Sequence, residues 1–436
     1  MPPAVTTGAQ LHALAAELYP ICRSITGNGL RQSLHLIRRR IPLVLHEVPS
    51  GTRLFDWQVP LEWNVEDAAV LDADGARVVD FRRHNLHLVN YSEPLQATLP
   101  LPELLPRLHA LPERPDWIPY RTSYYRRSWG FCLRERERAA LRPGPYRIEI
   151  RTSLARGALT YGELAIPGRT REEVLFFTHV CHPSLANDNT SGMAVATSLA
   201  AWIAAERRRL SYRFVFAPGT IGALAWLKRN EGRLQRIRHG LVLALLGDPA
   251  PLTYKLTRDG GREIDAVARH ALGATGITVP FSPYGYDERQ LNSPGFRLPV
   301  GRLTRSVNGG YPQYHTSADD LTLITPGALA ESLGACQRIV ELLEANEYYV
   351  NRNPKGEPRL GKRGLYGELG GAGPAAQEEA MLWVLNQSDG EHSLLSIAQR
   401  SGLSLTSVQA AAQALARARL LRPAGARAAR RSRASA

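Results

Sequence analysis

The sequence has 436 residues but only four cysteines, and no two of these form a CxxC pair. Neither a disulfide framework nor a structural zinc knuckle is expected from cysteines this far apart, which are Cys22, Cys132, Cys181 and Cys336. The sequence also lacks any run of about eighteen apolar residues, so no membrane-spanning helix is expected. No basic segment followed by an apolar one opens the chain, which argues against a secretory signal. These absences predict a cytoplasmic protein that has no membrane partner.

Acidic residues are absent from the C-terminal end, because none follows Glu391. A solvated chain end explains the resulting charge as well as a contact with nucleic acid or another anionic partner does. The base composition of the genome, if it favours arginine codons, would produce the same richness in arginine. Half of the formal net charge of +14 comes from seven arginines, which are Arg417, Arg419, Arg422, Arg427, Arg430, Arg431 and Arg433.

What is present is the composition of an ordinary globular protein, with 44% hydrophobic and 22% charged residues. A chain of this length is expected to form two or three domains. From residue 143 onward, apolar strands alternate with helices, which predicts an α/β fold with a mainly parallel sheet and helices on both faces. Strands are expected at 146–151, 159–166, 174–177, 212–217 and 240–246, and helices at 192–207, 221–229, 264–271 and 328–346.

Residues 1–51 and 119–350 are predicted to form this α/β domain, with a β-rich domain inserted at 52–118. Within the insertion, short alternating runs flank Asp74-Gly75, which is a strong hairpin signal. The tryptophans expected to pack the insertion against the main domain are Trp57, Trp63 and Trp117.

A segment just after the insertion, Tyr124 to Phe131, mixes aromatic residues with arginines. Packing of the insertion against the core is the simpler interpretation of this mixture. A platform for a sugar or a nucleotide is the alternative, because aromatic rings and arginines are also the side chains that stack on such ligands.

The chain changes character again after a linker rich in glycine and proline at residues 351–374. Residues 375–424 show three short helices with a tight turn at Gly402 before the last one. This arrangement predicts a winged-helix module, with Ser404 as the N-cap of the last helix. A basic tail is expected at 425–436.

Contacts with DNA or with another protein are both compatible with residues 375–436. The exposed part of the last helix offers Thr406, Ser407 and Gln409, which can contact bases or phosphates. The helix itself has no basic residue before Arg417, which favours docking to a protein instead. A homo-oligomer is equally compatible with the sequence.

The most informative residues follow the apolar strand at 174–177 and place two imidazoles and a carboxylate close together: His179, His182 and Asp188. A third imidazole, His315, comes much later, and Asp248 ends another apolar strand. Because the carboxyl ends of parallel strands meet at one edge of a sheet, these side chains are expected to converge there. Nitrogen and oxygen ligands of this kind hold a catalytic zinc ion. A lone histidine at a strand end is more often structural, but four such positions in order favour a metal site.

Residues 140–346 resemble the zinc aminopeptidases of the co-catalytic di-zinc type. The resemblance lies in the histidine at the strand end, His179, in the loop 187–192 and in the run Tyr314-His315-Thr316. Such a resemblance implies an α/β fold, zinc as the cofactor and hydrolysis of an amide bond as the activity.

The chain is more closely similar to an uncharacterised bacterial branch of that fold, over about residues 10–430. This branch shares the run 178–183, the segment 287–290, an inserted β domain and a C-terminal winged helix. Its members often accompany genes for polysaccharide or natural-product biosynthesis.

The resemblance implies that His179 is the first zinc ligand and that Asp188 is the carboxylate that bridges two metals. It also implies that Asp248 is the later acidic ligand of the first metal and that His315 is the terminal ligand of the second. His182 is then an extra imidazole, either a ligand itself or a partner that orients another ligand. One or two zinc ions are expected.

The most consequential departure from the family lies at Gly219 and Thr220. The aminopeptidases have adjacent glutamates here, one as general base and one as ligand, and the bacterial branch tends to keep one glutamate at the position of Gly219. Glycine cannot accept a proton, and threonine is a poor zinc ligand. General-base assistance typically contributes about 10²–10⁴-fold in rate, so its loss matters. Either Glu288 or Asp287 supplies the carboxylate from another loop, or the protein binds metal without efficient hydrolysis.

The charged run Asp287-Glu288-Arg289 has two interpretations. Three consecutive charges usually form a solvated loop. As functional residues, the two carboxylates would hold a substrate amino group, while Arg289 would hold a carboxylate or phosphate through a bidentate pair. Further residues expected to face the substrate are Tyr314, Tyr254 and Arg258.

These observations predict a metal-dependent hydrolase of aminopeptidase type. Its substrate would be the amide or peptide bond of a small peptide or an amino-acylated metabolite. One alternative is a catalytically weakened protein of the same fold that senses a ligand and acts as a regulator through its winged helix. Another is a nucleotide- or sugar-modifying protein that uses no metal.

Overall fold

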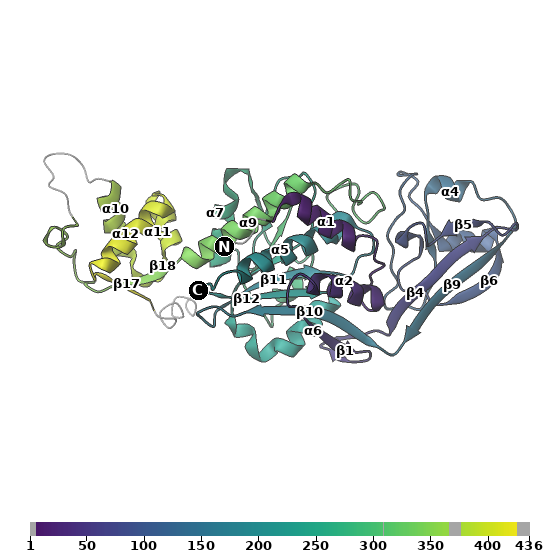
Figure 1. Cartoon of the computed structure of the whole chain (residues 1–436), viewed down its shortest axis with the longest axis horizontal. Helices are drawn as coiled ribbons and strands as arrows, with labels where there is room; N and C mark the ends of the chain where they lie inside the picture. Colours follow the sequence, from purple (N-terminus) through teal and green to yellow (C-terminus); the bar gives the residue numbers. More distant parts are fainter. Residues whose placement is uncertain (1–5, 308, 366–375, 425–436) are drawn as a thin grey trace. The chain divides into compact units, whose positions relative to one another are not determined.

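The computed structural model describes residues 6–307, 309–365 and 376–424. This part of the chain divides into two compact units, with the boundary after Arg338. The first unit is built around an eight-stranded sheet (Figure 1). In spatial order its strands are β1 (Val44–Pro49), β10 (Ala158–Ile166), β12 (Ser211–Ala217), β11 (Glu173–His179), β13 (Ile237–Leu243), β16 (Val300–Thr304), β14 (Thr253–Lys255) and β15 (Ile277–Val279).

The middle of this sheet is parallel, because β11 pairs in parallel with both β12 and β13, and β13 pairs in parallel with β16. Antiparallel pairs lie toward the edges, at β1–β10, β10–β12 and β14–β16. Every residue of β11 is buried, which explains the continuous apolar run in its sequence. The predicted α/β class is therefore confirmed.

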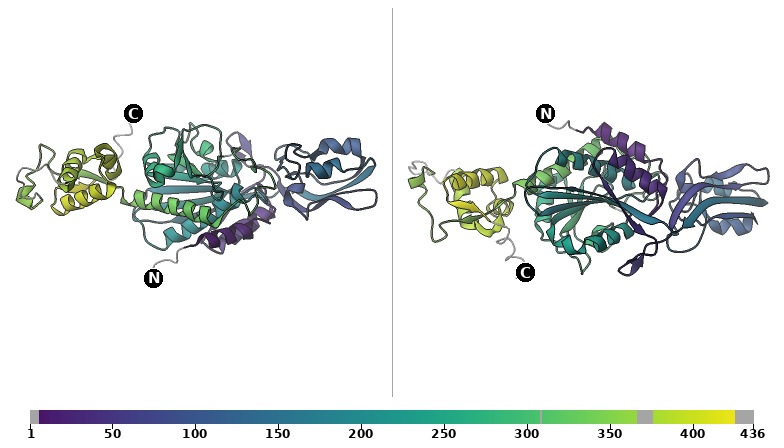
Figure 2. Two further views of the ribbon diagram at one scale, coloured as in Figure 1. Left: turned by 90° about the horizontal axis from the view of Figure 1, so that it is seen from above. Right: turned by 60° about the horizontal axis from the view of Figure 1, so that its bottom comes forward.

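Helices lie on both faces of the large sheet (Figures 1 and 2), with α1, α5 and α9 on one side and α6 on the other. The first helix starts at a capping box, in which Thr7 accepts from the backbone of Gln10 and the side chain of Gln10 accepts from Thr7. The longer helices are α1 (Gly8–Leu18), α2 (Asn28–Arg38), α5 (Gly192–Ala204), α6 (Ile221–Asn230), α7 (Glu263–Leu272) and α9 (Pro326–Ala345).

A second, four-stranded antiparallel sheet forms the β-rich part of the first unit. The hairpin predicted at Asp74-Gly75 is present, and Gly75 takes a φ of 81° there. The strand predicted at 146–151 as part of the α/β domain belongs to this smaller sheet, so the β-rich part does not end at residue 118. Its strands, in spatial order, are β5 (Arg77–Asp80), β4 (Glu62–Leu71), β9 (Pro145–Ala155) and β6 (Leu95–Pro100).

The tryptophans of this region behave differently from one another. Trp63 is 3% exposed, stacks on Tyr91 and donates its indole N–H to the carbonyl of Ser92, as a packing residue does. Trp57 was expected to pack in the same way, but it remains 38% exposed.

The short elements of the first unit are β2 (Arg53–Leu54), β3 (Trp57–Gln58), η1 (Asn85–His87), α3 (Leu101–Leu104), η2 (Leu105–Arg107), β7 (Leu108–His109), β8 (Phe131–Cys132), α4 (Glu135–Ala139), η3 (Ala186–Ser191), η4 (Glu231–Arg236), η5 (Gly273–Thr275) and α8 (Glu288–Leu291).

The second unit is a small helical module with a three-stranded sheet in which β17 lies between β18 and β19. Ser404 caps α12 by accepting from the backbone of Ser407, as predicted, and Gly402 ends α11 in the left-handed conformation. The predicted tail at 425–436 and residues 366–374 of the predicted linker lie outside the described residues. The elements are β17 (Tyr348–Asn351), η6 (Gly361–Arg363), α10 (Ala376–Gln387), β18 (Asp389–Ser393), α11 (Leu394–Ser401), α12 (Leu405–Arg417) and β19 (Leu421–Pro423).

Across the described ranges, no helix has both the length and the apolar character that crossing a membrane requires. All four cysteines are free thiols, in agreement with the absence of a disulfide framework from the sequence.

Candidate metal centre

The loop that follows β11 carries most of the candidate centre. His179 is the last residue of the strand, and Asp188 lies in η3, directly before α5. Both side chains are buried, with 1% and 0% exposure respectively. The strand end therefore delivers an imidazole and a carboxylate to the same interior point, at the carboxyl edge of the parallel strands.

Three imidazoles surround the carboxylate of Asp188. The Nε2 atom of His179 lies 2.6 Å from Oδ1, and Nδ1 of His182 lies 3.2 Å from the same oxygen. The Nε2 atom of His315 lies 3.1 Å from Oδ2, although the two residues are 127 positions apart in the chain. The ligand atoms of His179, His182 and Asp188 all lie within 4.8 Å of one another. The structure thus brings these four predicted residues together.

The electrostatics of the cluster favour an ionised carboxylate at Asp188, neutral imidazoles at His179 and His315, and a protonated imidazole at His182. Burial opposes ionisation of Asp188, but the imidazoles of His182 and His179 outweigh it and hold the pKa of this carboxyl well below its usual range. Burial lowers the pKa of His179 and also that of His315. The pKa of His182 is raised despite its burial, because Asp188 stabilises the protonated ring. Neutral imidazoles and an ionised carboxylate are the forms that bind a cation, so His182 would release its proton when a metal binds.

Asp319 holds the loop that carries Asp188. Its two oxygens accept from the backbone N–H groups of Asn187 and Asp188 at 2.5 Å and 3.0 Å. Burial raises the pKa of Asp319 to about 7, and these backbone donors oppose the shift. Nothing in the sequence around Asp319 distinguishes it from a solvated loop residue, so its role was not predicted.

Asp248 does not join the cluster, in contrast to its predicted role as a ligand. One of its oxygens accepts from the side chain of Asn187 at 2.7 Å, and the other accepts from the backbone N–H of Ala250 at 2.8 Å. Ser306 donates to both oxygens, through its backbone N–H and its hydroxyl. With these bonds made, Asp248 serves as a support for the loop before Asp188.

Aromatic rings orient the imidazoles. Tyr286 stacks on His179 with a centroid distance of 4.6 Å, and Tyr314 stacks on His315 with a centroid distance of 4.0 Å. Tyr120 meets the rings of His182 and His315 edge-on, at 5.3 Å and 5.2 Å. Tyr314 was predicted to lie near the site. Tyr120 was not, because its place depends on a backbone hydrogen bond from its N–H to the carbonyl of His315, which joins segments far apart in the chain.

The loop between β12 and α6 places Gly219 beside the cluster. Its backbone N–H donates to the sulfur of Cys181 at 3.3 Å. A Cβ atom added at Gly219 would lie 3.5 Å from that sulfur and 3.8 Å from the Cβ atom of His179, which are ordinary contacts. Steric crowding at Cβ therefore does not require glycine at this position, and a side chain there would start next to His179.

Asp287 packs against this same loop. It is 1% exposed, and its Oδ1 accepts from the backbone N–H of Thr220 at 2.7 Å. Its Oδ2 has no hydrogen-bond partner among the residues that the structure describes. Burial, helped by the nearby Glu288 carboxylate, raises the pKa of Asp287 to about 7, against the opposing bond from Thr220. A carboxyl with a free oxygen and this pKa can both take up and release a proton near neutral pH.

Glu288 has a different environment from its neighbour. It is fully buried, and its Oε1 lies 3.0 Å from Nζ of Lys255 and 3.3 Å from Nη1 of Arg302. The ammonium of Lys255 also donates to the carbonyl of Tyr284 at 2.7 Å. Glu288 is thus held by two buried cations, so of the two predicted surrogate bases Asp287 is the one in contact with the Gly219 loop.

The other predicted substrate-binding residues separate in the structure. Arg289 donates from Nη2 to the hydroxyl of Thr220 at 3.1 Å, so it borders the site. Tyr254 is fully buried and donates its hydroxyl to Asp265 at 2.9 Å, and that carboxylate also caps the start of α7. Arg258 is exposed, with its backbone N–H on Asn292 at 3.2 Å. Tyr254 therefore belongs to the core and Arg258 to the surface, instead of the predicted pocket.

Comparison with known proteins agrees with this architecture. A family model described as a domain of unknown function, DUF4910, matches residues 12–346, and a winged helix-turn-helix model matches residues 347–423. A protein from Clostridium acetobutylicum is 47% identical over 420 residues, which cover 95% of this chain and 96% of the relative. The chain belongs to the DUF4910 family. The relative carries the provisional name of a polysaccharide biosynthesis protein with an aminopeptidase-like domain.

Solved structures place this DUF4910 chain in the aminopeptidase fold. A crystal structure from Clostridium acetobutylicum, provisionally named a peptidase, has a TM-score of 0.88 and 46% identity, over 95% of this chain and 96% of that one. The zinc aminopeptidase of Bacillus subtilis has a TM-score of 0.56 with 13% identity, over 77% of this chain and 94% of that one. A precursor of an M28 peptidase from Shewanella amazonensis has a TM-score of 0.55 with 12% identity, over 77% of this chain and 92% of that one. The resemblance to zinc aminopeptidases is confirmed at the level of the fold.

The donor set of the DUF4910 chain fits a zinc ion. Zinc binds imidazole nitrogens and carboxylate oxygens in sites of low coordination number. His179, His182, His315 and Asp188 supply such donors. Their rings are held by tyrosines, and the backbone of the Asp188 loop is held by Asp319. Such outer partners keep ligands in place before the metal arrives.

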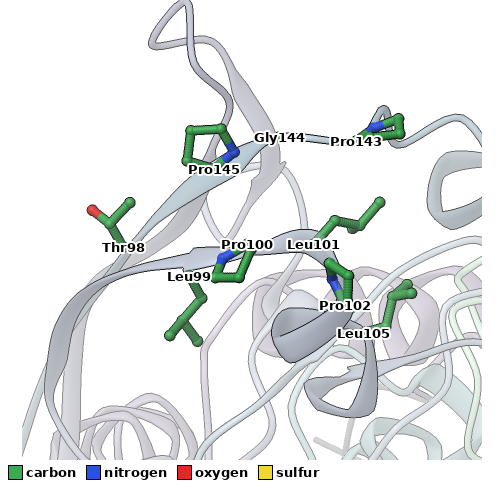
Figure 3. A pocket seen from close by; sticks show the side chains of 9 residues that line it. All are labelled: Thr98, Leu99, Pro100, Leu101, Pro102, Leu105, Pro143, Gly144 and Pro145. Carbon is green, nitrogen blue, oxygen red and sulfur yellow. The ribbon is translucent and has the colours of Figure 1, made fainter.

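A cavity of about 460 Å³ in the β-rich part has no comparable chemistry (Figure 3). Its lining contains no titratable side chain, and Thr98 supplies its only side-chain polar group. It consists of Thr98, Leu99, Pro100, Leu101, Pro102, Leu105, Pro143, Gly144 and Pro145.

Proposed function

We propose that this DUF4910 chain is a zinc-dependent hydrolase of aminopeptidase type. It would cleave the amide or peptide bond of a small peptide or an amino-acylated metabolite. The observation that carries the proposal is the convergence of three imidazoles on the buried carboxylate of Asp188. The aminopeptidase fold supports the reaction class.

His179, His182, Asp188 and His315 would hold the zinc. Bound there, zinc would supply a Lewis acid that polarises the carbonyl of the scissile amide. The carboxylate of Asp188 lies within hydrogen-bond distance of all three imidazoles. Tyr286 stacks on His179 and Tyr314 stacks on His315, and this stacking would hold the two rings in the orientation that binds the metal.

Asp287 would act as the general base in place of the missing glutamate at Gly219. Its carboxyl is bonded to the backbone of Thr220, one residue from that glycine, and Oδ2 is left without a protein partner in the described chain. It would take the proton of the attacking water and pass it to the departing amine. Glu288 is the weaker candidate, because Lys255 and Arg302 both pair with its Oε1, although its Oε2 also has no hydrogen-bond partner in the described chain.

Arg289 and Tyr314 border the centre and would position the substrate. The guanidinium of Arg289 donates to Thr220, so it faces the same loop as Asp287. The name of the Clostridium acetobutylicum relative supports a metabolite of polysaccharide synthesis, instead of a protein, as the amide-bearing substrate.

Metal analysis together with an amidase assay tests the proposal. Purified full-length protein is expected to contain about one or two zinc ions and to release p-nitroaniline from aminoacyl p-nitroanilides. His315→Ala is expected to lower both the zinc content and the rate. Protein that takes up no zinc at micromolar concentration would rule out the metal site.

A second candidate is a ligand-sensing regulator of the same fold, supported by Gly219 and by the winged helix. In that case the protein would bind zinc without measurable turnover, and its second unit would contact DNA or another protein. A zinc-replete protein that shows no amidase activity but shifts a DNA fragment in a gel would favour this candidate.

A further inference from the structure

A second cavity, of about 400 Å³, lies in the first unit beside the hairpin of β2 and β3. Its volume is within the range of sites for small molecules. Unlike the cavity of Figure 3, it has aromatic and charged side chains in its lining. Those that the argument uses are Asp56, Trp57, Tyr124, Tyr125 and Arg126.

The aromatic rings of this cavity are exposed instead of packed. Trp57 is 38% exposed and Tyr125 is 53% exposed, and their rings meet edge-to-face at a centroid distance of 5.3 Å. Neither ring belongs to the hydrophobic core of this region, which contains the stacked pair of Trp63 and Tyr91. Exposure of two adjacent aromatic rings to water is unfavourable, and a ligand that covers the rings would remove this exposure.

Charged groups of both signs stand beside these rings. Asp56 and Arg126 line the cavity, and both residues are exposed to solvent. Arg127 approaches only Glu93, at 3.8 Å. The cavity therefore offers apolar faces together with a hydrogen-bond acceptor and hydrogen-bond donors that a ligand can reach from solvent.

We infer that this cavity binds a pyranose unit of a saccharide. A pyranose ring has an apolar face of C–H groups, which stacks on tryptophan and tyrosine, and a rim of hydroxyls, which both donate and accept. The carboxylate of Asp56 can accept hydrogen bonds from these hydroxyls, and the guanidinium of Arg126 can donate hydrogen bonds to them.

Two tyrosine side chains in contact link the lining of the cavity to the imidazoles of the metal centre. Tyr124 lines the cavity, and its hydroxyl lies 2.7 Å from the hydroxyl of Tyr120. Tyr120 in turn meets the rings of His182 and His315. On the proposed function, on which this step rests, a substrate with its sugar in the cavity would present its amide to the metal. The substrate class would then be an amino-acylated or N-acylated saccharide.

Calorimetric titration of the full-length protein with chitotetraose, maltotetraose and tetragalacturonate tests the inference. At least one of these probes is expected to bind. Trp57→Ala and Tyr125→Ala are each expected to weaken binding about tenfold or more, which is the usual effect of removing one stacking ring. Ile277→Ala, at a 45% exposed position of the edge strand β15, is the control and should bind as the natural protein does.

The inference is overturned if none of the three saccharides binds, or if both aromatic variants keep full affinity. Stronger binding of a tetrapeptide, lost in Trp57→Ala, would also overturn it, because the cavity would then be a peptide site. Thermal unfolding of each variant excludes misfolding as the cause. His315→Ala separates the two proposals, because it should abolish amidase activity while saccharide affinity stays unchanged.

Discussion

The carboxylate of Asp287 lies 2.7 Å from the backbone nitrogen of Thr220, directly beside the glycine at position 219. The two segments are 67 positions apart in the chain. A buried carboxyl whose Oδ2 has no hydrogen-bond partner in the described chain thus lies beside Gly219, which is the basis for the proposal that Asp287 acts as the general base.

Replacement of Asp287 by asparagine is expected to lower kcat for amide hydrolysis about 10²–10⁴-fold, which is the usual contribution of a general base. Because the pKa of Asp287 is raised to about 7, chiefly by burial, the activity of the natural protein should rise as pH increases through about 7. Asp287→Asn should lose that limb of the pH profile. An unchanged pH–rate profile in the variant would show that the proton goes elsewhere.

The same variant should be more stable than the natural protein above pH 7. The folded-state pKa of Asp287 exceeds its unfolded value of 3.8, so ionisation of this group opposes folding as pH rises from about 4 through about 7. Asparagine removes that penalty. Urea unfolding at pH 5 and pH 8 measures the difference, and a loss of stability at pH 8 would contradict it.

Glutamate at position 219 is expected to restore activity to Asp287→Asn. A Cβ atom added at this position would lie no closer than 3.5 Å to any other atom, so Gly219→Glu should fold. The new side chain would leave the backbone beside His179. The test compares kcat in Asp287→Asn with kcat in the double variant that also contains Gly219→Glu, and the expected gain is at least tenfold. Gly219→Gln is the control of matched size and should give no gain.

Replacement of His179 or His315 by alanine is expected to weaken zinc binding by more than the roughly 10–100-fold that loss of an outer-shell partner costs. The natural protein should also gain thermal stability on addition of zinc, because the metal binds only the folded state. His392→Ala serves as the control, since His392 pairs with Asp389 at 2.8 Å in the second unit. Equal zinc content in all three variants would remove these histidines from the site.

Replacement of Glu288 by glutamine is expected to lower the free energy of unfolding by about 3 kcal/mol or more. The change leaves Lys255 and Arg302 buried, each 3% exposed at the side chain, without the carboxylate that neutralises them. Glu17→Gln is the matched control. Its partner Arg40 is exposed, and such pairs contribute about 0–1 kcal/mol. Equal losses in the two variants, measured by urea unfolding, would contradict the buried-triad assignment.

Several elements followed from the sequence alone. The last helix with its cap at Ser404, the buried strand that ends at His179 and the hairpin at Asp74-Gly75 all occur as predicted. Caps, turns and apolar periodicity are local, so they can be recognised without knowledge of the rest of the fold. The strand at 146–151 was recognised as a strand, but its pairing partners in the smaller sheet were not.

The sequence by itself determined the α/β class and the set of imidazoles and carboxylates near strand ends, because both depend on short-range pattern. Only the tertiary structure decided how these side chains divide among roles. In the folded chain Asp248 accepts from Asn187, Tyr254 donates to Asp265, and Glu288 pairs with two buried cations. Asp287 accepts from Thr220, next to Gly219. The direction of a side chain at a contact between distant segments depends on the packing of both segments, and that information is not present in either one alone.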